Sequence, residues 1–233
     1  MGLTREDLTE GRLEALIAEL APQGLMTFLS VEERRESLRT MLQHCCPTED
    51  VWLFGYGSLM WNPAIEYVAE AQGRLHGYHR RFALWTPLGR GTPEQPGLTL
   101  ALERGGSCQG IAFRIEAAKV PAELGLVWSR EMLSGAYHPR WVRLQTAQGP
   151  IRAITFVINP THERYAGRLP IDRVAETLAC AEGRLGSCRE YLENTVAHLA
   201  EIGIADRHMG ELLALVRRLA PGWQPPVAAT AGL

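Results

Sequence analysis

The spacing of hydrophobic and polar residues predicts two amphipathic helices near the start of the chain. Apolar residues recur every three or four positions from Leu13 to Leu20, which is the period of a half-buried helix. Ser30 and Glu33 then have the spacing of a capping box, and a second apolar stripe follows them. No residue in this part has an evident chemical role. We therefore expect residues 1–46 to be a helical appendage packed on the main domain.

Strand patterns fill the middle of the chain. Residues 51–54 are four consecutive large apolar residues and predict a buried strand. Residues 71–84 alternate imperfectly between apolar and polar, and Gly77 within them indicates a curved or bulged strand. Gly105-Gly106 predicts a hairpin turn between the next two strands. The further predicted strands are 98–103, 108–115, 141–147 and 151–158.

Helical patterns return in the second half of the chain. Pro121 marks a helix start, because proline is favoured in the first turn. Ser187 and Glu190 have the spacing of a second capping box. The other predicted helices cover 171–181 and 206–219. Together the elements predict a mixed α/β domain over residues 47–220, followed by a Pro/Ala-rich tail at 221–233.

The glycine-rich turn after the first predicted strand is the strongest candidate for a binding loop. Gly55 and Gly57 allow the backbone to turn sharply, so that the amides of Tyr56–Leu59 can surround an anion or a developing oxyanion. Met60 stands where a dinucleotide fingerprint or a nucleophile elbow needs glycine. Lys119 is the only lysine and is remote from this turn, which excludes a phosphate P-loop.

Composition excludes several classes of partner. The 233 residues are 46% hydrophobic and 21% charged with a net charge of -2, as in an ordinary globular protein without a broad nucleic-acid surface. No run approaches the roughly 20 apolar residues of a membrane span. The five cysteines have no zinc spacing, and their odd number favours reduced thiols in the cytoplasm. We expect no metal site, no nucleic acid and no membrane insertion.

Glu131 is the candidate catalytic residue. It occupies the position after Val127 and Trp128 on the apolar stripe of a predicted helix. A carboxylate at such a position either pairs with a buried arginine, for which Arg130 and Arg140 are near in sequence, or is kept for chemistry. Desolvation beside Trp128 would raise its pKa toward the value that suits a general base.

Two other residues are candidates for the same cavity. Arg90 lies in a loop rich in glycine and proline, where it can either bind a substrate carboxylate through paired hydrogen bonds or brace the loop. Tyr137 follows Glu131 closely enough to reach the cavity, whereas His138 beside it is expected to be structural or solvated.

Four motifs in this order resemble the ChaC-type γ-glutamylcyclotransferases. The motifs are 54–59, 90–94 with Pro96-Gly97, 129–132 with 135–137, and 183–192, and the match runs from about Val51 to Leu219. The resemblance implies a small mixed α/β fold, with a curved or barrel-like sheet surrounded by helices, that acts without metal or cofactor. It also implies a cytoplasmic lyase that cleaves glutathione to 5-oxoproline and cysteinylglycine.

The resemblance also assigns roles to individual residues. Glu131 matches the catalytic glutamate, which would act as general base and acid while the γ-glutamyl α-amine attacks the γ-carbonyl. Tyr137 and Tyr191 fall where the family places tyrosines around the substrate. The loop that holds the γ-glutamyl group would consist of Phe54, Gly55, Tyr56, Gly57, Ser58 and Leu59. One departure is Cys188, where the family pattern leads us to expect asparagine; Ser187 can replace that asparagine if its role is to cap the helix.

Two other functions are compatible with the sequence. A cyclotransferase for γ-glutamyl amino acids or γ-glutamylamines would differ only at the far side of the pocket. A non-catalytic protein that binds a partner and regulates cation transport would not need Glu131. The presence of Glu131 together with the complete glycine-rich turn favours an enzyme.

Overall fold

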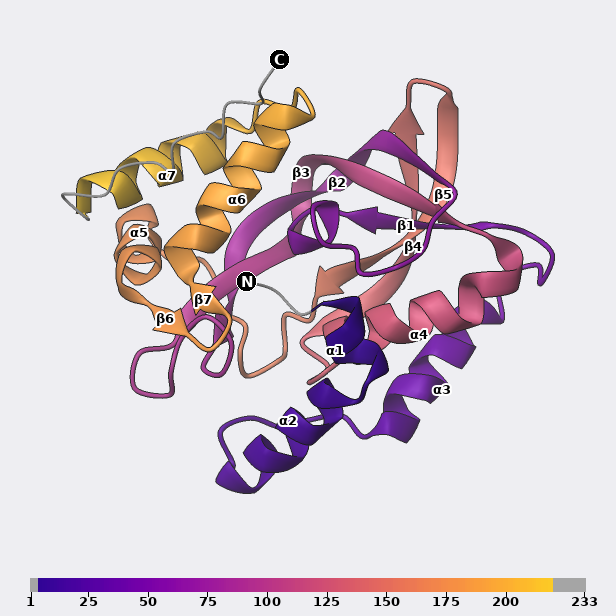
Figure 1. The fold of residues 1–233 in the computed structure, drawn as a ribbon. Coiled ribbons are helices and arrows are strands. Elements are labelled where there is room, and N and C mark those ends of the chain that lie inside the picture. The colour runs from indigo at the N-terminus through magenta and orange to yellow at the C-terminus, as the bar shows by residue number, and fades with distance from the viewer. Residues whose placement is uncertain (1–3, 220–233) are drawn as a thin grey trace, which may run out of the picture.

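Five strands close into a barrel in the order β1-β3-β2-β4-β5 (Figure 1). The computed structural model describes residues 4–219. The strands are β1 (Val51–Gly55), β2 (Ala69–Thr86), β3 (Gly97–Ile115), β4 (Tyr137–Thr146) and β5 (Gly149–Ile158). Neighbours are antiparallel except β1 and β5, which run parallel and close the barrel. Four of the five residues of β1 are buried, which explains its continuous apolar sequence.

β2 and β3 form one long, bent hairpin whose connecting loop carries Arg90. The predicted bulge in β2 is confirmed, because the register shifts between His76 and Tyr78 at Gly77. The predicted hairpin turn at Gly105-Gly106 is wrong. These two glycines have positive φ angles, but they form the other side of the same bulge within a single strand. A pair of glycines permits either geometry, and the long-range pairing with β2 selects the bulge.

Helices lie in two groups on different sides of the barrel (Figure 1). The first group consists of α1 (Arg5–Thr9), α2 (Arg12–Leu20), α3 (Val31–Leu42) and α4 (Val120–Glu131). The second consists of α5 (Ile171–Cys180), α6 (Cys188–Glu201) and α7 (Arg207–Leu219). Short elements connect these: the 3₁₀ turns η1 (Ala21–Gln23), η2 (Ser58–Met60) and η3 (Ala117–Lys119), and the two-stranded sheet of β6 (Glu182–Gly183) and β7 (Gly186–Ser187).

The capping signals locate the helices well. The capping box of Ser30 and Glu33 opens α3, and Ser187 caps α6 by accepting a hydrogen bond from the amide of Glu190. α1 is an additional helix that was not predicted, because its short run carries no buried residue and only its cap, Thr4, marks it. The predicted tail at 221–233 lies outside the described residues.

The helices of the N-terminal segment contact α4 through side chains and backbone. Arg5 donates two hydrogen bonds to the Glu123 carboxylate at 2.6 and 2.7 Å, and Trp128 Nε1 donates to Ser37 Oγ at 3.1 Å. The amide of Leu29 donates to the carbonyl of Leu133 at 2.8 Å, two residues beyond the end of α4. The segment is therefore packed on the helix that carries Glu131. That residues 1–46 are a separate appendage stays a prediction.

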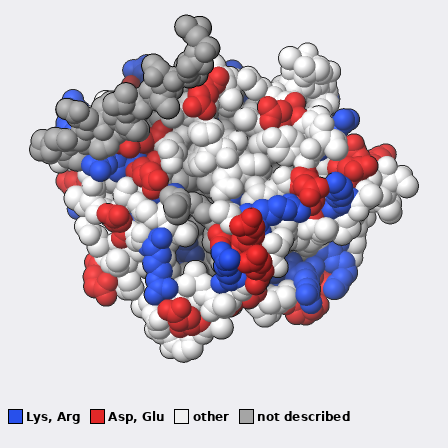
Figure 2. Space-filling view, in the orientation of Figure 1, with Lys and Arg blue, Asp and Glu red and all other residues white. Residues whose placement is uncertain are grey.

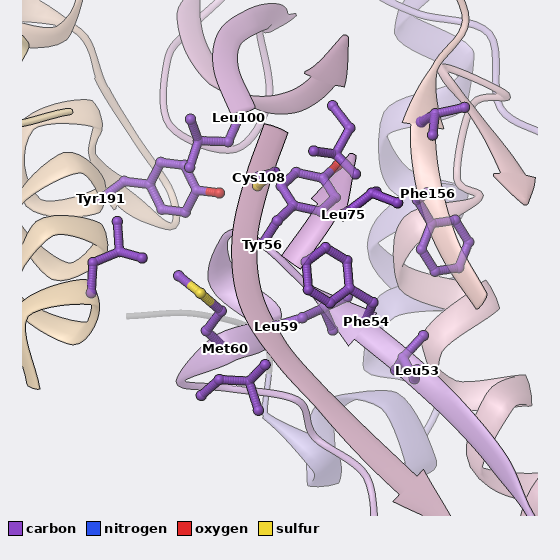
Figure 3. Close-up of a cluster of buried hydrophobic side chains, with 14 of the residues drawn as sticks. Leu53, Phe54, Tyr56, Leu59, Met60, Leu75, Leu100, Cys108, Phe156 and Tyr191 are labelled. Atoms are coloured by element: carbon purple, nitrogen blue, oxygen red, sulfur yellow. The ribbon is translucent and has the colours of Figure 1, made fainter. Parts of the chain in front are cut away.

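The core joins the barrel to the C-terminal helices. Side chains from several strands and from α6 meet in one cluster, in which Phe54 and Phe156 are almost completely buried (Figure 3). Burying a side chain of this size contributes about 1.5–3 kcal/mol to folding. Tyr191 enters the same cluster from α6, with its ring edge-on to Phe82 at 5.8 Å between centroids. The core thus fixes α6 relative to the barrel.

The surface has no extended region of one charge on the face that Figure 2 shows. Basic and acidic side chains are interspersed there, in agreement with the net charge of -2. Within residues 4–219, no helix combines the length and apolar character that crossing a membrane requires.

The Arg5–Glu123 pair predicts a pH-dependent contribution to stability. The Glu123 side chain is 4% exposed, and hydrogen bonding from Arg5 holds the pKa of Glu123 below its ordinary value. Arg5→Met is expected to lower the free energy of unfolding by about 1.5–3 kcal/mol at pH 7. Because the folded-state pKa is depressed, this contribution is present above the unfolded-state pKa and is lost as pH falls through the folded-state value.

Urea unfolding measured between pH 7 and pH 3 checks this expectation. Arg12→Met is the matched control, because Arg12 is 62% exposed and pairs with Asp7 and Glu10 at the surface. Its effect should be much smaller than that of Arg5→Met, because solvent screens an exposed ion pair. Equal losses in the two variants at pH 7 would show that the Glu123 pair contributes no more than a surface pair.

Candidate active site

A cavity of about 500 Å³ lies at the loop end of the β2–β3 hairpin. Its walls come from the turn after β1, the β2–β3 loop, the end of α4, the start of β4, the segment before α5 and one face of α6. This volume lies within the roughly 300–1,000 Å³ of small-molecule sites. Elements from the whole length of the domain therefore contribute to a single cavity.

The glycine-rich turn forms one wall. Tyr56, Gly57, Ser58 and Leu59 line the cavity, whereas Phe54 and Gly55 belong to β1 behind it. Ser58 begins the 3₁₀ turn η2, and its amide hydrogen-bonds to the Tyr191 hydroxyl. No backbone carbonyl within residues 4–219 accepts from the amide of Leu59. A Cβ on Gly57 would lie 2.9 Å from the Tyr191 hydroxyl, so this close approach requires glycine. The predicted binding loop is thus divided into four lining residues and two supporting ones.

Glu131 is the last residue of α4 and lines the cavity. Of the two alternatives for this carboxylate, pairing with an arginine is confirmed, with Arg130 as the partner; Glu131 also faces the cavity, and its role in chemistry stays a prediction. Arg130 Nε lies 3.0 Å from Glu131 Oε1, and the two side chains are 10% and 16% exposed respectively. Arg140, the other arginine considered, is an exposed residue of β4.

Arg130 links Glu131 to the glycine-rich turn. Its two terminal nitrogens donate to Ser58 Oγ at 2.6 Å and to the carbonyl of Asn62 at 2.7 Å. The guanidinium therefore binds both ends of the turn while its Nε faces the carboxylate. This arrangement holds Glu131 at a fixed position relative to Ser58.

The surroundings of Glu131 favour its protonated form more than water does. Burial raises the pKa of Glu131, and the positive charge of Arg130 opposes that rise. The carboxylate also lies at the C-terminal end of α4, where the helix dipole disfavours a negative charge. A carboxylate with a raised pKa can both accept and return a proton near neutral pH.

Three tyrosines surround the carboxylate. Burial raises the pKa of Tyr56, Tyr137 and Tyr191, and the charge of Glu131 adds to each rise, so all three hydroxyls stay protonated. The Tyr137 hydroxyl donates to the carbonyl of Leu100 at 2.8 Å. Figure 3 shows the Tyr191 hydroxyl directed from α6 toward the barrel, beside Leu100. The predicted tyrosines Tyr137 and Tyr191 thus both line the cavity.

Arg90 lies on the α6 side of the cavity and is largely buried, at 8% exposure. It donates to the carbonyl of Ser187 at 2.8 Å, its Nη1 lies 3.4 Å from Glu190 Oε2, and its guanidinium packs over the Tyr191 ring at 4.9 Å. Arg90 therefore braces its loop against α6, and it also faces the cavity. Its role in binding a substrate carboxylate stays a prediction.

Cys188 does not line the cavity but hydrogen-bonds to the two ends of the segment 90–98 behind it. Its thiol lies 3.1 Å from the carbonyl of Arg90 and accepts from the amide of Leu98 at 3.3 Å. Ser187, the preceding residue, caps α6. The departure from the family pattern at Cys188 therefore falls at a residue that supports the loop from behind.

Sequence analysis did not identify Arg164 and Ser134 as residues of the site. Both line the cavity, and Arg164 Nη1 donates to Ser134 Oγ at 3.0 Å. The two residues are thirty positions apart in loops with no motif. Only the closed barrel brings them together, so no local signal could have found them. Within residues 4–219, no group of three or more His, Cys, Asp or Glu side chains is placed to hold a metal ion.

Comparisons with known proteins agree in family and fold. The sequence model of the family described as "ChaC-like protein" matches residues 51–219. The glutathione-specific gamma-glutamylcyclotransferase of Escherichia coli K12 is 41% identical over 192 residues, which cover 82% of this chain and 83% of that protein. The human glutathione-specific gamma-glutamylcyclotransferase 1 is 28% identical over 188 residues, which cover 78% and 85% of the two chains.

A solved structure shows the same fold. The crystal structure of the selenomethionine-labelled, glutathione-specific γ-glutamylcyclotransferase from yeast superposes with a TM-score of 0.68 at 20% identity, over 72% of this chain and 96% of that chain. The predicted fold class, a mixed α/β fold with a barrel-like sheet and surrounding helices, is therefore confirmed.

The environment of Cys188 predicts slow reaction with alkylating reagents. Burial raises the pKa of Cys188 to about 11, so little of the nucleophilic thiolate is present at pH 8. Iodoacetamide should therefore modify the exposed Cys46 and Cys180 first and leave Cys188 unmodified until the protein unfolds. Peptide mass spectrometry after timed quenching measures the order. Early modification of Cys188 in the folded protein would contradict its buried role in the loop.

Proposed function

The chain belongs to the ChaC-like protein family, and from this premise we propose that it is a γ-glutamylcyclotransferase that cleaves glutathione to 5-oxoproline and cysteinylglycine, with Glu131 as the general base. The observation that carries the assignment of Glu131 is its position, on a cavity wall and bound through Arg130 to Ser58 of the glycine-rich turn. The specificity for glutathione rests on the relatives that carry this name.

The reaction uses a nucleophile that the substrate contains. The α-amino nitrogen of the γ-glutamyl group attacks the γ-carbonyl carbon, which forms the lactam C–N bond, and the amide bond to cysteine then breaks. Two protons leave the glutamyl nitrogen and two arrive at the cysteinyl nitrogen, so that the whole reaction consumes neither water nor protons. Glu131 accepts a proton from the attacking nitrogen and returns it to the leaving nitrogen.

The glycine-rich turn supplies the second contribution. The amide of Leu59, which has no backbone carbonyl partner within residues 4–219, is available to donate to the oxyanion that forms when the γ-carbonyl is attacked. Loss of one such donor typically costs about 2.7–4 kcal/mol of transition-state stabilisation. Arg130 keeps this turn and Glu131 together, so the proton acceptor and the oxyanion donor act on the same γ-glutamyl group. Holding the flexible glutamyl chain in an attack geometry is the third contribution.

Substrate carboxylates need cationic partners, and Arg90 is the proposed partner for the α-carboxylate of the γ-glutamyl group. It lies on the cavity wall with its guanidinium over the Tyr191 ring. The odd number of cysteines favours reduced thiols and therefore a cytoplasmic location, which stays a prediction.

Product analysis tests the proposed function directly. Purified protein is incubated with glutathione, and in parallel with γ-glutamyl-alanine, and the products are identified by mass spectrometry. We expect 5-oxoproline and cysteinylglycine from glutathione. Turnover of γ-glutamyl-alanine alone would keep the cyclisation and change the substrate. Free glutamate would show hydrolysis, and the cyclisation mechanism would be wrong.

Glu131→Gln tests the assigned general base. The variant keeps the size of the side chain but cannot accept the proton, so kcat for glutathione is expected to fall by about 10²–10⁴-fold. Its thermal unfolding should stay close to that of the wild type. Glu116→Gln, at an exposed glutamate just before α4 and outside the cavity, is the control and should keep full activity. Turnover near the wild-type rate in Glu131→Gln would remove Glu131 from the mechanism.

Arg130→Gln is expected to move the acid limb of the kcat/KM pH profile to higher pH. Arg130 opposes the rise in the pKa of Glu131, so removal of its positive charge raises that pKa further and less of the base form is present at a given pH. Arg130→Lys keeps the charge and should shift the limb less. The profiles are compared with one substrate in one buffer series. An unchanged limb in Arg130→Gln would separate Glu131 from the titration that limits the rate.

A further inference from the structure

We infer that Arg164 binds the C-terminal carboxylate of the substrate, and that it thereby selects γ-glutamyl compounds whose leaving group is a dipeptide. The inference rests on the proposed function and names the part of the site that recognises the leaving group. It starts from an arginine on the cavity wall that the mechanism does not use.

Arg164 is held in place by backbone and side-chain contacts. The segment around it pairs with the end of β2, since the amide of Trp85 donates to the Arg164 carbonyl at 2.9 Å. The side chain then turns back, and its Nε donates to the carbonyl of Trp85 at 2.7 Å. Nη1 donates to Ser134 Oγ at 3.0 Å and lies 3.7 Å from the sulfur of Met26. The guanidinium therefore has a fixed position on the cavity wall.

Arg164 differs from the other two arginines of the cavity in its electrostatic partners. Arg90 lies beside Glu190 and Arg130 beside Glu131, each within ion-pair distance. No acidic side chain within residues 4–219 forms an ion pair with Arg164, whose side chain contacts a carbonyl, a hydroxyl and a thioether. Glu163 attracts it only at longer range, and burial lowers the pKa of Arg164. A desolvated cation of this kind gains strongly from a carboxylate that arrives with the ligand.

The position of Arg164 relative to Glu131 is compatible with the length of a dipeptide leaving group. Arg164 donates to Ser134, which lies three residues after Glu131. The Cα atoms of Ser134 and Glu131 are therefore at most about 11 Å apart. The charges of Glu131 and Arg164 both act on the Tyr137 hydroxyl, which places the two groups around the same ring. In cysteinylglycine the carboxylate lies two residues, or about 7 Å, from the bond that breaks. A γ-glutamyl amino acid carries this carboxylate one residue closer, and a γ-glutamylamine lacks it.

The test compares glutathione with its glycine amide, in which a neutral amide replaces the C-terminal carboxylate. For the wild type, kcat/KM is expected to be about tenfold to a hundredfold higher for glutathione, mainly through KM, because hydrogen bonds to a charged group are lost in the amide. In Arg164→Gln, kcat/KM for glutathione should fall to the value for the amide. The value for the amide itself should not change.

Two further variants make the test specific. Arg164→Lys keeps the charge but loses the paired geometry and should recover part of the preference for glutathione. Arg168→Gln, at an exposed arginine of the same segment that does not line this cavity, should behave as the wild type with both substrates. Thermal unfolding of each variant identifies any that fails to fold, and the comparison of acid with amide in the wild type shows without any variant whether the enzyme recognises the carboxylate.

Two results would overturn the inference alone, with the proposed function intact. One is a wild type that releases 5-oxoproline equally well from glutathione and from its amide. The other is an Arg164→Gln variant that loses the same factor with both substrates, which would show that Arg164 supports the loop without contacting the carboxylate. Absence of 5-oxoproline from every substrate would overturn the proposed function, and this inference with it.

Discussion

The contacts of one buried arginine hold the site to the rest of the molecule. Arg80, in β2, is 4% exposed and donates to the carbonyl of Tyr56 at 2.6 Å and to the carbonyl of Gln109 in β3. Its Nε faces Asp206, just before α7, at 3.0 Å. A buried cation must have partners of this kind, because a desolvated and unpaired charge is costly. The glycine-rich turn therefore starts from a carbonyl whose position is set jointly by the barrel and the C-terminal helices.

A second arginine performs the same task on the other side of the turn. Arg130 binds Ser58 and Asn62 at the two ends of η2 and faces Glu131. The turn is thus fixed from the barrel by Arg80 and from α4 by Arg130, while the amide of Leu59 has no backbone carbonyl partner in the described part of the chain. Positioning by charged hydrogen bonds is what a preorganised site requires.

Capping residues and apolar periodicity predict most of the helices and strands. Where these signals allow two geometries, contacts between distant parts of the chain select one. The capping residues Ser30 and Ser187 and the apolar periodicity of α4 were sufficient to place their helices, because caps and helix faces depend on neighbours in sequence. Gly105-Gly106 was misjudged because a glycine pair is compatible with both a turn and a bulge. The sequence indicates Glu131 as a charge on an apolar stripe. It gives no such signal for Arg164, whose place in the site depends on contacts with residues distant in sequence, such as Ser134.

The parallel pairing of β1 with β5 has a consequence for how the chain folds. Trp52 lies opposite Ala153, so the barrel cannot close until the polypeptide has been made as far as β5. During synthesis the hydrophobic β1 must wait for this partner, and pairings between such distant segments form slowly. Tyr56 and Gly57 emerge from the ribosome early, but the pocket that they line also needs Tyr191. Competence to bind a ligand is therefore acquired late, when nearly the whole domain has been translated.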